Sequence, residues 1–393
     1  MNVAIFTDSF PPNVDGVSRC SLGYANAISE ENYGKVIVVS PRKPGVKYDY
    51  PFPVYCFNSL STGYHEFRAG HPFIPKLILE MKKLNIDIIH SHSPFIAMTS
   101  ARQVRQFLKI PIVFTQHTKW DYDLARAIPV KTIARSLERF AYNNINAADE
   151  VWAVSQGAGK YLQQRGYKGD YFVMPNGTDF PKGNVNEAFL RELKIKYNLV
   201  DNVPVMLFVG RMMWYKGIGL IIDALEMLKN RGFNFRMIFV GDGEDLQRAE
   251  NSVNEKNLGD LIFFAGRVND REKLRAFYTC SDLFVFPSTY DTAGLVVLEA
   301  AACSCPSLVV RGSAAAEIIT DDFNGYLCEQ TPHSLADSIH KVLNDSDKHK
   351  AVSHRASEEL YVPWSKIVER SMERYKRVKD NYDRFEGSKF KIF

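Results

Sequence analysis

The chain has 393 residues, more than a single hydrophobic core ordinarily supports, so two domains are expected. Hydrophobic residues make up 46% and charged residues 24%, a balance typical of globular proteins. No run of about 18 uncharged apolar residues occurs, so a membrane-spanning helix is not expected.

The charge is uneven along the chain. Residues 1–180 hold 20 Lys and Arg against 15 Asp and Glu, residues 361–393 hold 9 against 5, and residues 181–360 hold 20 against 25. A basic first part and tail can face an anionic surface or substrate. The start MNVAIFTDSF lacks the features of a signal peptide, and the six cysteines form no C-x-x-C pair, so a cytoplasmic protein with reduced thiols is expected.

The first part of the chain alternates short apolar runs with amphipathic stretches. The runs NVAIFTD, KVIVVS, IDIIHSH, PIVFTQH and EVWAVS predict buried parallel strands, and KLILEMKK and TIARSLERFAYNN predict helices. The stretch YFVMPNGTDF ends this unit, which places the first domain boundary near residue 180. A doubly wound α/β domain over residues 1–180 follows from this alternation.

Two residues of this part stand where a strand gives way to a loop. Gly16, in SFPPNVDGVSRC, precedes a predicted helix, and a glycine there lets the backbone approach a phosphate, although an ordinary turn is the better explanation of this stretch taken alone. His117 ends the strand PIVFTQH at the edge where ligands bind in such sheets, although a structural histidine is the alternative. We do not interpret the acidic pair in DYD at 121–123 as a metal site.

The second part repeats the same alternation. After PKGNVNEAFLRELKIKYNLVDNV, a predicted linker with a short helix, come the strands PVMLFVG, FRMIFVGDG, LIFFAGR, LFVFPS and PSLVV. They predict a second doubly wound domain over residues 181–363. The stretch WSKIVERSMERYKRVKDNYDRFEG predicts a C-terminal helix, residues 364–393, whose basic character matches the first domain and suggests that it packs there.

The stretch GRMMWYKG joins a predicted strand to a predicted helix. Arg211 and Lys216 therefore lie at the carboxyl end of a strand, where a guanidinium and an ammonium can neutralise a diphosphate. Solvated loop charges are the alternative interpretation.

A second strand-to-helix junction carries YDTAGLVVLEA. Backbone N–H groups of Thr292–Leu295, that is Thr292, Ala293, Gly294 and Leu295, would face an anion at the start of the helix. Asp291 precedes them and can accept hydrogen bonds from a hydroxylated ligand, or simply cap the helix. Glu299 lies within an apolar run, where a carboxylate is better explained by a ribose contact than by exposure.

These motifs in this order resemble the retaining glycosyltransferases of family 4. GRMMWYKGIGLIIDAL, FVGDGEDL, FAGRVNDREKL and PSTYDTAGLVVLEAAACSCP carry the resemblance, together with DGVS, HSHSPF, VFTQHT, VSQGAG and VMPNGTD. The resemblance covers nearly the whole chain and implies the GT-B architecture, two Rossmann-like doubly wound domains facing a central cleft. It makes the first domain the acceptor domain and the second the nucleotide-sugar domain.

The resemblance also implies roles for single residues. Asp291 takes the first acidic position, near the sugar hydroxyls, and Glu299 the second, on the ribose. Arg211 and Lys216 hold the diphosphate and stabilise the leaving group, so no metal or other cofactor is expected. Gly16 approaches the phosphates, Arg267 and Val268 border the base, and His117 lies near the anomeric centre and the acceptor.

Three positions depart from the family pattern. Asp291 stands in place of Glu, Asp15 precedes Gly16 in place of a second glycine, and Ser304 stands where glycine is common. The shorter side chain of Asp291 leaves the sugar open. The family's mechanism is transfer with retention, in which the departing phosphate helps to deprotonate the incoming hydroxyl.

The acceptor is predicted from a further likeness. DTAGLVVLEA and QHTKWDYDLARAIP are most similar to the branch that glycosylates diacylglycerol. Lys131, Arg135 and Arg139 at helical spacing, with Trp120 before them, are assigned to an anionic membrane surface and a lipid acceptor, although a solvated helix face is the alternative. The expected protein is thus peripheral on the inner face of the cell membrane.

The expected donor is UDP-glucose or UDP-galactose. Alternatives are GDP-mannose as donor, a soluble or polysaccharide acceptor, and a catalytically silent nucleotide-sugar binder, for which Asp291 is the sole support. Nucleic acid is not an expected partner, because no recognisable binding module accompanies the basic part.

Overall fold

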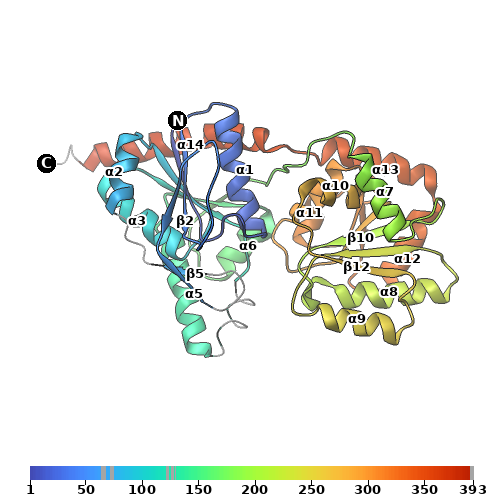
Figure 1. The fold of residues 1–393 in the computed structure, drawn as a ribbon. Coiled ribbons are helices and arrows are strands. Elements are labelled where there is room, and N and C mark those ends of the chain that lie inside the picture. The colour runs from blue at the N-terminus through green and yellow to red at the C-terminus, as the bar shows by residue number, and fades with distance from the viewer. Residues whose placement is uncertain (63–67, 71–74, 121–123, 125–127, 129, 390–393) are drawn as a thin grey trace. The chain divides into compact units, whose positions relative to one another are not determined.

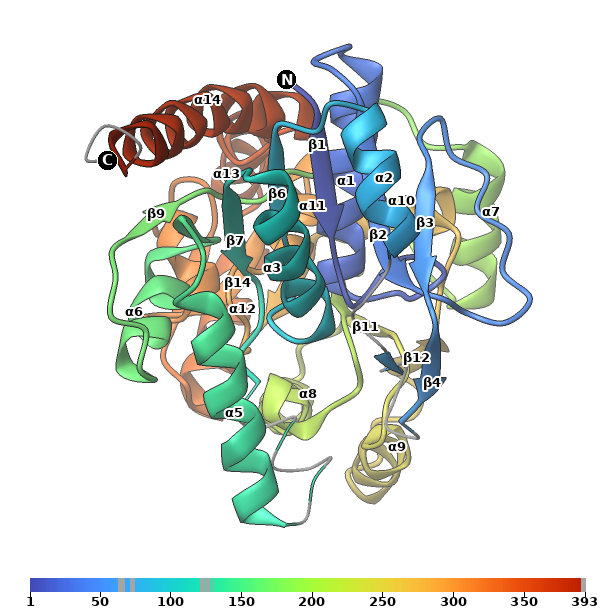
Figure 2. The ribbon, with the colours of Figure 1, turned by 90° about the vertical axis from the view of Figure 1, so that its left-hand side faces the viewer.

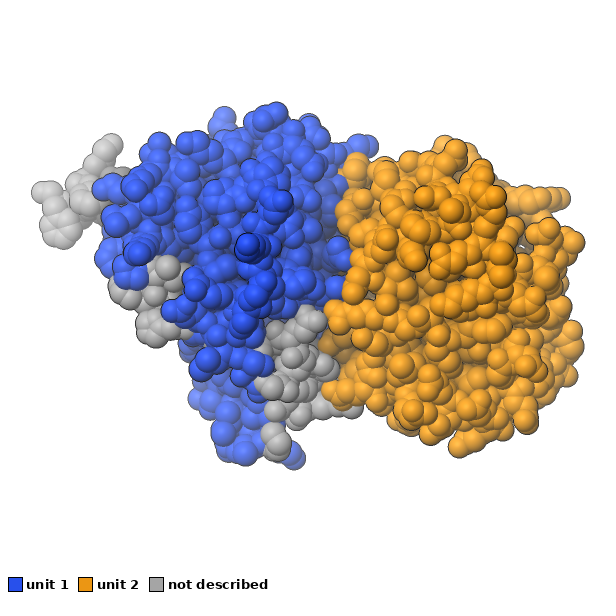
Figure 3. Space-filling view, in the orientation of Figure 1, with its two compact units in different colours: residues 1–177, 364–393 blue, residues 178–363 orange. Residues whose placement is uncertain are grey.

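The computed structural model describes the chain except for residues 63–67, 71–74, 121–123, 125–127, 129 and 390–393. It divides into two compact units, residues 1–177 with 364–393 (unit 1) and residues 178–363 (unit 2), shown in separate colours in Figure 3. The chain thus leaves unit 1 after Gly177 and returns at Trp364, so the C-terminal helix belongs to the same unit as the N-terminal strands.

Unit 1 is built on a parallel sheet whose seven described strands follow the order β3-β2-β1-β6-β7-β8-β9 (Figure 2). Its central strands are buried at almost every residue, as the continuous apolar runs predict, whereas its two edge strands are mostly half-buried. The strands are β1 (Val3–Phe6), β2 (Val36–Pro41), β3 (Val54–Phe57), β6 (Ile88–Ser91), β7 (Ile112–Gln116), β8 (Glu150–Ala153) and β9 (Tyr171–Val173), with an antiparallel pair β4 (Ser59–Ser61) and β5 (Arg68–Gly70).

Helices cover both faces of this sheet. On one face α2 and α5 adjoin α3, and on the other α1 packs against α14 (Figures 1 and 2). The helices are α1 (Gly16–Glu30), α2 (Pro75–Lys83), α3 (Ile96–Leu108), α5 (Lys131–Ile145), α6 (Gln156–Gln164) and α14 (Trp364–Lys389).

Specific contacts, more than general basicity, fix α14 on unit 1. Arg374 makes a two-point ion pair with Glu150, at 2.7 and 2.9 Å. The Trp364 ring lies so close to α1 that a Cβ on Gly23 would approach it to 2.3 Å. Gly23 is therefore the residue that lets α14 begin against α1.

Unit 2 has a parallel sheet whose six described strands follow the order β12-β11-β10-β13-β14-β15. In Figure 1, α8 and α9 lie on one side of this sheet and α10 and α11 on the other. The strands are β10 (Val205–Val209), β11 (Arg236–Val240), β12 (Ile262–Gly266), β13 (Leu283–Phe286), β14 (Ser307–Val310) and β15 (Tyr326–Cys328). The helices are α7 (Glu187–Lys196), α8 (Ile218–Asn230), α9 (Leu246–Glu255), α10 (Arg271–Thr279), α11 (Leu295–Ala302), α12 (Pro332–Asn344) and α13 (Ser346–Glu359), with 3₁₀ turns η1 (Trp214–Lys216) and η2 (Ala314–Ile318).

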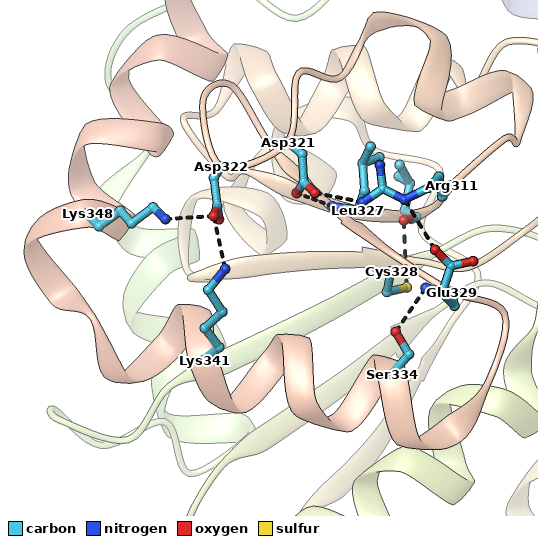
Figure 4. A network of polar contacts seen from close by, with 10 residues as sticks. Arg311, Asp321, Asp322, Leu327, Cys328, Glu329, Ser334, Lys341 and Lys348 are labelled. Atoms are coloured by element: carbon cyan, nitrogen blue, oxygen red, sulfur yellow. Dashed lines mark hydrogen bonds and ion pairs between the residues drawn. The ribbon is translucent and has the colours of Figure 1, made fainter.

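The edge strand β15 is absent from the predicted strands because its three residues carry little pattern. Side chains hold it instead: Asp321 accepts a hydrogen bond from the Leu327 N–H at 2.9 Å, and Arg311 pairs with both Asp321 and Glu329 (Figure 4). Next to it Asp322 accepts from two lysines, Lys341 at 2.9 Å and Lys348 at 2.7 Å. This network is structural and lies on the surface of unit 2.

Candidate functional site

Lys216 and Asp291, predicted separately for one site, meet in the structure. The loop after β10 carries Lys216 in the turn η1, and Gly217 follows in the left-handed region at φ +83°. A Cβ on Gly217 would come within 3.0 Å of the Pro287 carbonyl oxygen, so glycine allows this loop to approach the end of β13. Lys216 Nζ then lies 2.7 Å from Asp291 Oδ1.

The surroundings of Asp291 keep its carboxylate ionised. Burial acts to raise its pKa, but Lys216, a hydrogen bond from Ser288 Oγ at 2.5 Å and the charge of Arg211 hold the pKa below its ordinary value. The side chains of Lys216 and Asp291 are 11% and 25% exposed. Lys216 and Arg211 are thus cations at the carboxyl end of a parallel sheet, where α/β proteins bind ligands.

The segment after Asp291 turns into α11 as predicted. Gly294 precedes the helix in the left-handed region at φ +60°, and Thr292 is buried while Ala293 and Leu295 are half-buried. The first-turn N–H groups of a helix have no acceptor within the helix and lie at its positive end. One polar group of opposite charges is therefore formed by Arg211, Lys216, Asp291 and the start of α11, and it is named here the strand-end site.

Glu299 is buried in α11 and both of its oxygens have protein donors. Arg271 Nη2 lies 2.7 Å from Oε1, and the Tyr278 hydroxyl donates to Oε2 at 3.1 Å. Burial and Glu299 together raise the pKa of Tyr278 well above its ordinary value. Glu299 is therefore not an exposed carboxylate, and its contact with a ribose stays a prediction.

Arg271 is a residue that the sequence analysis did not identify. It bridges two carboxylates, because its Nε also donates to Asp179 Oδ2 at 3.1 Å, and its guanidinium lies 4.1 Å from the Phe180 ring centroid. Burial acts to lower its pKa, but Glu299 and Asp179 raise it above the ordinary value. The sequence contains one indication of this role. Arg271 is the first residue of α10, where the helix dipole favours an acidic side chain, so an arginine at this position indicates that a carboxylate nearby binds it.

Arg267 and Val268 lie in the loop after β12. Arg267 is exposed and its Nη1 lies 3.8 Å from Asp242 Oδ2, in the loop that follows β11, while Val268 packs on the core of unit 2. Both residues line a cavity of about 240 Å³. The structure therefore places Arg267 and Asp242 at neighbouring strand ends, and the contact of Arg267 and Val268 with a base stays a prediction.

Gly16 differs from its expected setting in one respect. It is the first residue of α1 and does not precede the helix, because Asp15 is the N-cap and accepts a hydrogen bond from the Ser18 N–H at 2.9 Å. Ser9 Oγ donates to the other Asp15 oxygen. Asp15 has extended backbone at φ −142°, so the aspartate in place of a glycine brings no strain.

His117 belongs to a cluster of three histidines in unit 1. Its Nε2 is 2.8 Å from His92 Nδ1, and the two rings stack with centroids 5.0 Å apart. His90 lies beside them, with Nε2 2.6 Å from Thr115 Oγ1 and Nδ1 2.6 Å from the Tyr375 hydroxyl of α14. Burial lowers the pKa of His117 to about 3 and those of His90 and His92 well below the ordinary value. All three rings are therefore neutral at pH 7.

The neutral histidines make the stability of the protein sensitive to acid. Below about pH 6.5 each of these side chains takes up a proton on unfolding that the folded state does not bind, so stability falls as the pH falls toward 3. Asp8 acts in the opposite direction, since burial raises its pKa to about 7, but it is one group against three. We expect denaturant titrations of His117→Asn to show a pH slope shallower by about 1.4 kcal/mol per unit between pH 6 and pH 5. An unchanged slope would contradict the neutral assignment of His117.

The basic residues assigned to a membrane lie on α5. Lys131, Arg135 and Arg139 are exposed, and so are the large apolar side chains of Ile133 (52%) and Phe140 (39%). Burial of this helix is confined to its last turns, from Ala141 onward, and its first turns extend away from the sheet in Figures 1 and 2. The helix thus carries an uncovered basic and apolar surface.

Trp120 does not share that surface, contrary to its assignment. Its ring is 8% exposed and packs edge-on against Phe95 and Tyr142 in the core of unit 1. A buried indole of this kind supports the fold and cannot insert into a lipid surface. The nearby DYD at 121–123 lies outside the described residues.

Within the described parts of the chain, no helix combines the length and apolar character needed to cross a membrane. The same residues contain no cluster of three or more histidine, cysteine or acidic side chains able to hold a metal ion.

Comparison with known proteins agrees with this geometry. Residues 14–180 match the family model described as Glycosyltransferase Family 4, and residues 191–359 match that of Glycosyl transferases group 1. The chain is 30% identical to an uncharacterized glycosyltransferase of Methanocaldococcus jannaschii over 78% of this chain and 79% of that protein. It is 23% identical to the alpha-monoglucosyldiacylglycerol synthase of Streptococcus pneumoniae over 92% of this chain and 82% of that protein.

Among solved structures, Anabaena HepE in complex with UDP and glucose superposes with a TM-score of 0.73 at 19% identity, covering 95% of this chain and 99% of that one. At this identity the likeness concerns the fold. Two units, each with a parallel Rossmann-like sheet, are the components of the GT-B fold. The chain therefore belongs to the family 4 glycosyltransferases of GT-B fold.

Proposed function

We propose that this glycosyltransferase moves a hexose, with retention of configuration and without a metal, from UDP-glucose or UDP-galactose to a membrane lipid such as diacylglycerol. The strand-end site carries the proposal, because Lys216 and Asp291 meet beside the start of α11. That arrangement offers cations and helix N–H groups to a diphosphate and a carboxylate to sugar hydroxyls.

Each residue of the strand-end site has a role in this proposal. Arg211 and Lys216 bind the diphosphate and stabilise the charge that develops on it as the glycosidic bond breaks. Lys216 exchanges its contact with Asp291 for the phosphate, and Asp291 then accepts hydrogen bonds from the sugar. The N–H groups of Thr292–Leu295 face the donor at the start of α11.

The nucleoside is bound by the second group of residues. Glu299 accepts from the ribose hydroxyls while Arg271 and Tyr278 hold its carboxylate in place. Arg267 and Val268 border the base. Two cations replace the charge that a metal ion would supply, which is why none is proposed.

His117 takes part in this proposal as a neutral ring. A neutral imidazole exchanges single hydrogen bonds with a hydroxyl, whereas its low pKa makes it a poor acceptor of a full proton. We therefore assign the acceptor proton to the departing phosphate and a positioning contact to His117.

The lipid acceptor is supported by two independent observations. The name of the Streptococcus relative specifies a diacylglycerol glycolipid, and α5 presents Lys131, Arg135 and Arg139 with exposed apolar side chains. Basic helices of this kind bind anionic membrane surfaces at the cytoplasmic face. The protein would accordingly act as a peripheral protein there.

Reversing charge on α5 tests the membrane contact. We expect Lys131→Glu with Arg135→Glu to weaken binding to anionic vesicles at least about tenfold, because each cation near the surface contributes about 1 kcal/mol. Co-sedimentation with phosphatidylglycerol vesicles measures the effect. The matched control is Arg191→Glu with Lys194→Glu, which makes the same charge change at exposed residues of α7 in unit 2. Equal binding by the two double variants would exclude α5 as the contact.

The donor is tested by equilibrium titration. Calorimetry with UDP and GDP, in EDTA and in magnesium, reports the base and the need for metal in one series. The proposal expects UDP to bind more tightly than GDP and equally in both media. Tighter binding of GDP would favour the alternative donor, GDP-mannose. The alternative acceptor, a soluble molecule or a polysaccharide, is tested by the dependence of transfer on the lipid.

A further inference from the structure

A cavity in unit 1 lies apart from the residues assigned above. Its volume is about 540 Å³, and it is formed by the loop after β2, the edge strand β3 and the first turn of α2. Arg42, Lys43 and Lys76 line it, together with Tyr48, Tyr55 and Cys56.

The charge of this cavity has one sign. None of the described residues that line it is acidic, and the first turn of α2 likewise carries Lys76 and no acidic residue. The nearest carboxylate along α2, Glu80, is engaged by Lys83, whose Nζ lies 2.9 Å from it. Arg42 and Lys76 are both exposed, and two cations that line one hollow repel each other unless an anion lies between them.

The backbone holds the loop in a defined shape. The Val46 N–H donates to the Lys43 carbonyl at 3.4 Å, and Gly45 has φ +76°, the geometry of a turn with proline at its second position and glycine at its third. Arg42 is fixed from both sides, since its N–H donates to Phe57 O and its carbonyl accepts from Ser59 Oγ, each at 2.8 Å. The backbone of Arg42 and Lys43 is thus held in a turn that hydrogen bonds fix.

We propose that this cavity binds a small phosphate-bearing molecule or headgroup. The phosphate pairs with Arg42 and Lys76, and the organic part lies on the rings of Tyr48 and Tyr55. A phosphate offers several charged oxygens to these two cations, and a volume of about 540 Å³ exceeds what the phosphate alone fills. The site is a property of unit 1 and does not depend on the donor residues of unit 2.

Cys56 supplies a local readout of occupancy. It lines the cavity, and burial raises the pKa of its thiol, so that an alkylating reagent modifies it slowly enough to follow. We expect glycerol 3-phosphate to slow the alkylation of Cys56 in the full chain in a saturable way, measured by mass spectrometry of the Cys56 peptide. Glycerol, which lacks the phosphate, should not slow it.

Two variants separate the cavity from general basicity. Arg42→Ala with Lys76→Ala should weaken protection by glycerol 3-phosphate at least about tenfold. Lys47→Ala, an exposed lysine of the same loop that does not line the cavity, should leave protection unchanged. Circular dichroism and thermal melting show that each variant is folded. Absence of saturable protection, or equal protection in the double variant, would overturn the proposal.

The same assay distinguishes the two sources of phosphate. Protection by phosphatidylglycerol vesicles, but not by phosphatidylcholine vesicles, at far lower phosphate concentration than glycerol 3-phosphate assigns the cavity to a lipid headgroup. Protection by glycerol 3-phosphate alone assigns it to a soluble phosphate ester. No donor is present in either arm, so a negative result leaves the transferase proposal unaffected.

Discussion

Replacing Lys216 with alanine is expected to lower sugar transfer by about 100- to 1,000-fold, because one preorganised cation facing a developing charge contributes roughly that much. Lys216 lies 2.7 Å from Asp291 in the structure and is half-buried, so its ammonium is already desolvated and aimed at the strand-end site. The loss should appear mainly in kcat, since the charge on the leaving phosphate grows as the bond breaks.

The fold of this variant should survive. Asp291 retains the hydrogen bond from Ser288 and the favourable charge of Arg211, so its negative charge remains stabilised. The matched control is Lys229→Ala, which removes an exposed lysine of the neighbouring helix α8. Loss of activity in both variants, or retention of full kcat by Lys216→Ala, would remove Lys216 from the mechanism.

Replacing Arg271 with methionine is expected to destabilise the protein by about 3–5 kcal/mol, because it leaves a buried carboxylate without its partner. Glu299 is 11% exposed at its side chain, and Arg271 also holds Asp179 immediately after the chain enters unit 2. Denaturant titration measures the loss. Donor affinity should fall as well, since the Glu299 carboxylate would no longer be fixed toward the ribose.

A second substitution tests the cause of that destabilisation. Adding Glu299→Gln to Arg271→Met removes the orphaned charge and should recover part of the lost stability while donor affinity stays low. Lys273→Met is the control, because this residue of the same helix makes an exposed ion pair with Glu192 at 3.7 Å. Additive effects of the two changes would show that Arg271 and Glu299 do not act as a pair.

The sequence was sufficient for much of the fold. Continuous apolar runs such as VIVVS and VMLFV became central strands, because parallel strands covered on both faces need apolar residues at every position. The strands β3 and β15 were not predicted, because each is a short edge strand with little pattern, and side chains such as Arg311 and Asp321 hold β15. Ser304, noted for replacing a glycine, does adopt a positive φ of +56°.

The charged residues of the candidate site could be identified from the sequence, but the ion pairs that they form could not. Motif order led to Arg211, Lys216, Asp291 and Glu299, but the sequence does not show that Lys216 and Asp291 form an ion pair. Arg271 and His92 act through contacts with residues that are distant in sequence, and only packing reveals them. Trp120 was misassigned because an aromatic residue beside basic residues fits a core position as well as a membrane one.

The most direct test of the account is the release of nucleotide from UDP-glucose, UDP-galactose and GDP-mannose, each with anionic vesicles that contain or lack diacylglycerol. The account predicts UDP release from one UDP-sugar only when diacylglycerol is present, with a matching glycolipid in the vesicles. Release that is the same with and without diacylglycerol would contradict the proposal of a lipid acceptor. Release from GDP-mannose alone would contradict the proposal of a UDP-sugar donor. No release from any donor would contradict the proposed transfer and favour a silent nucleotide-sugar binder.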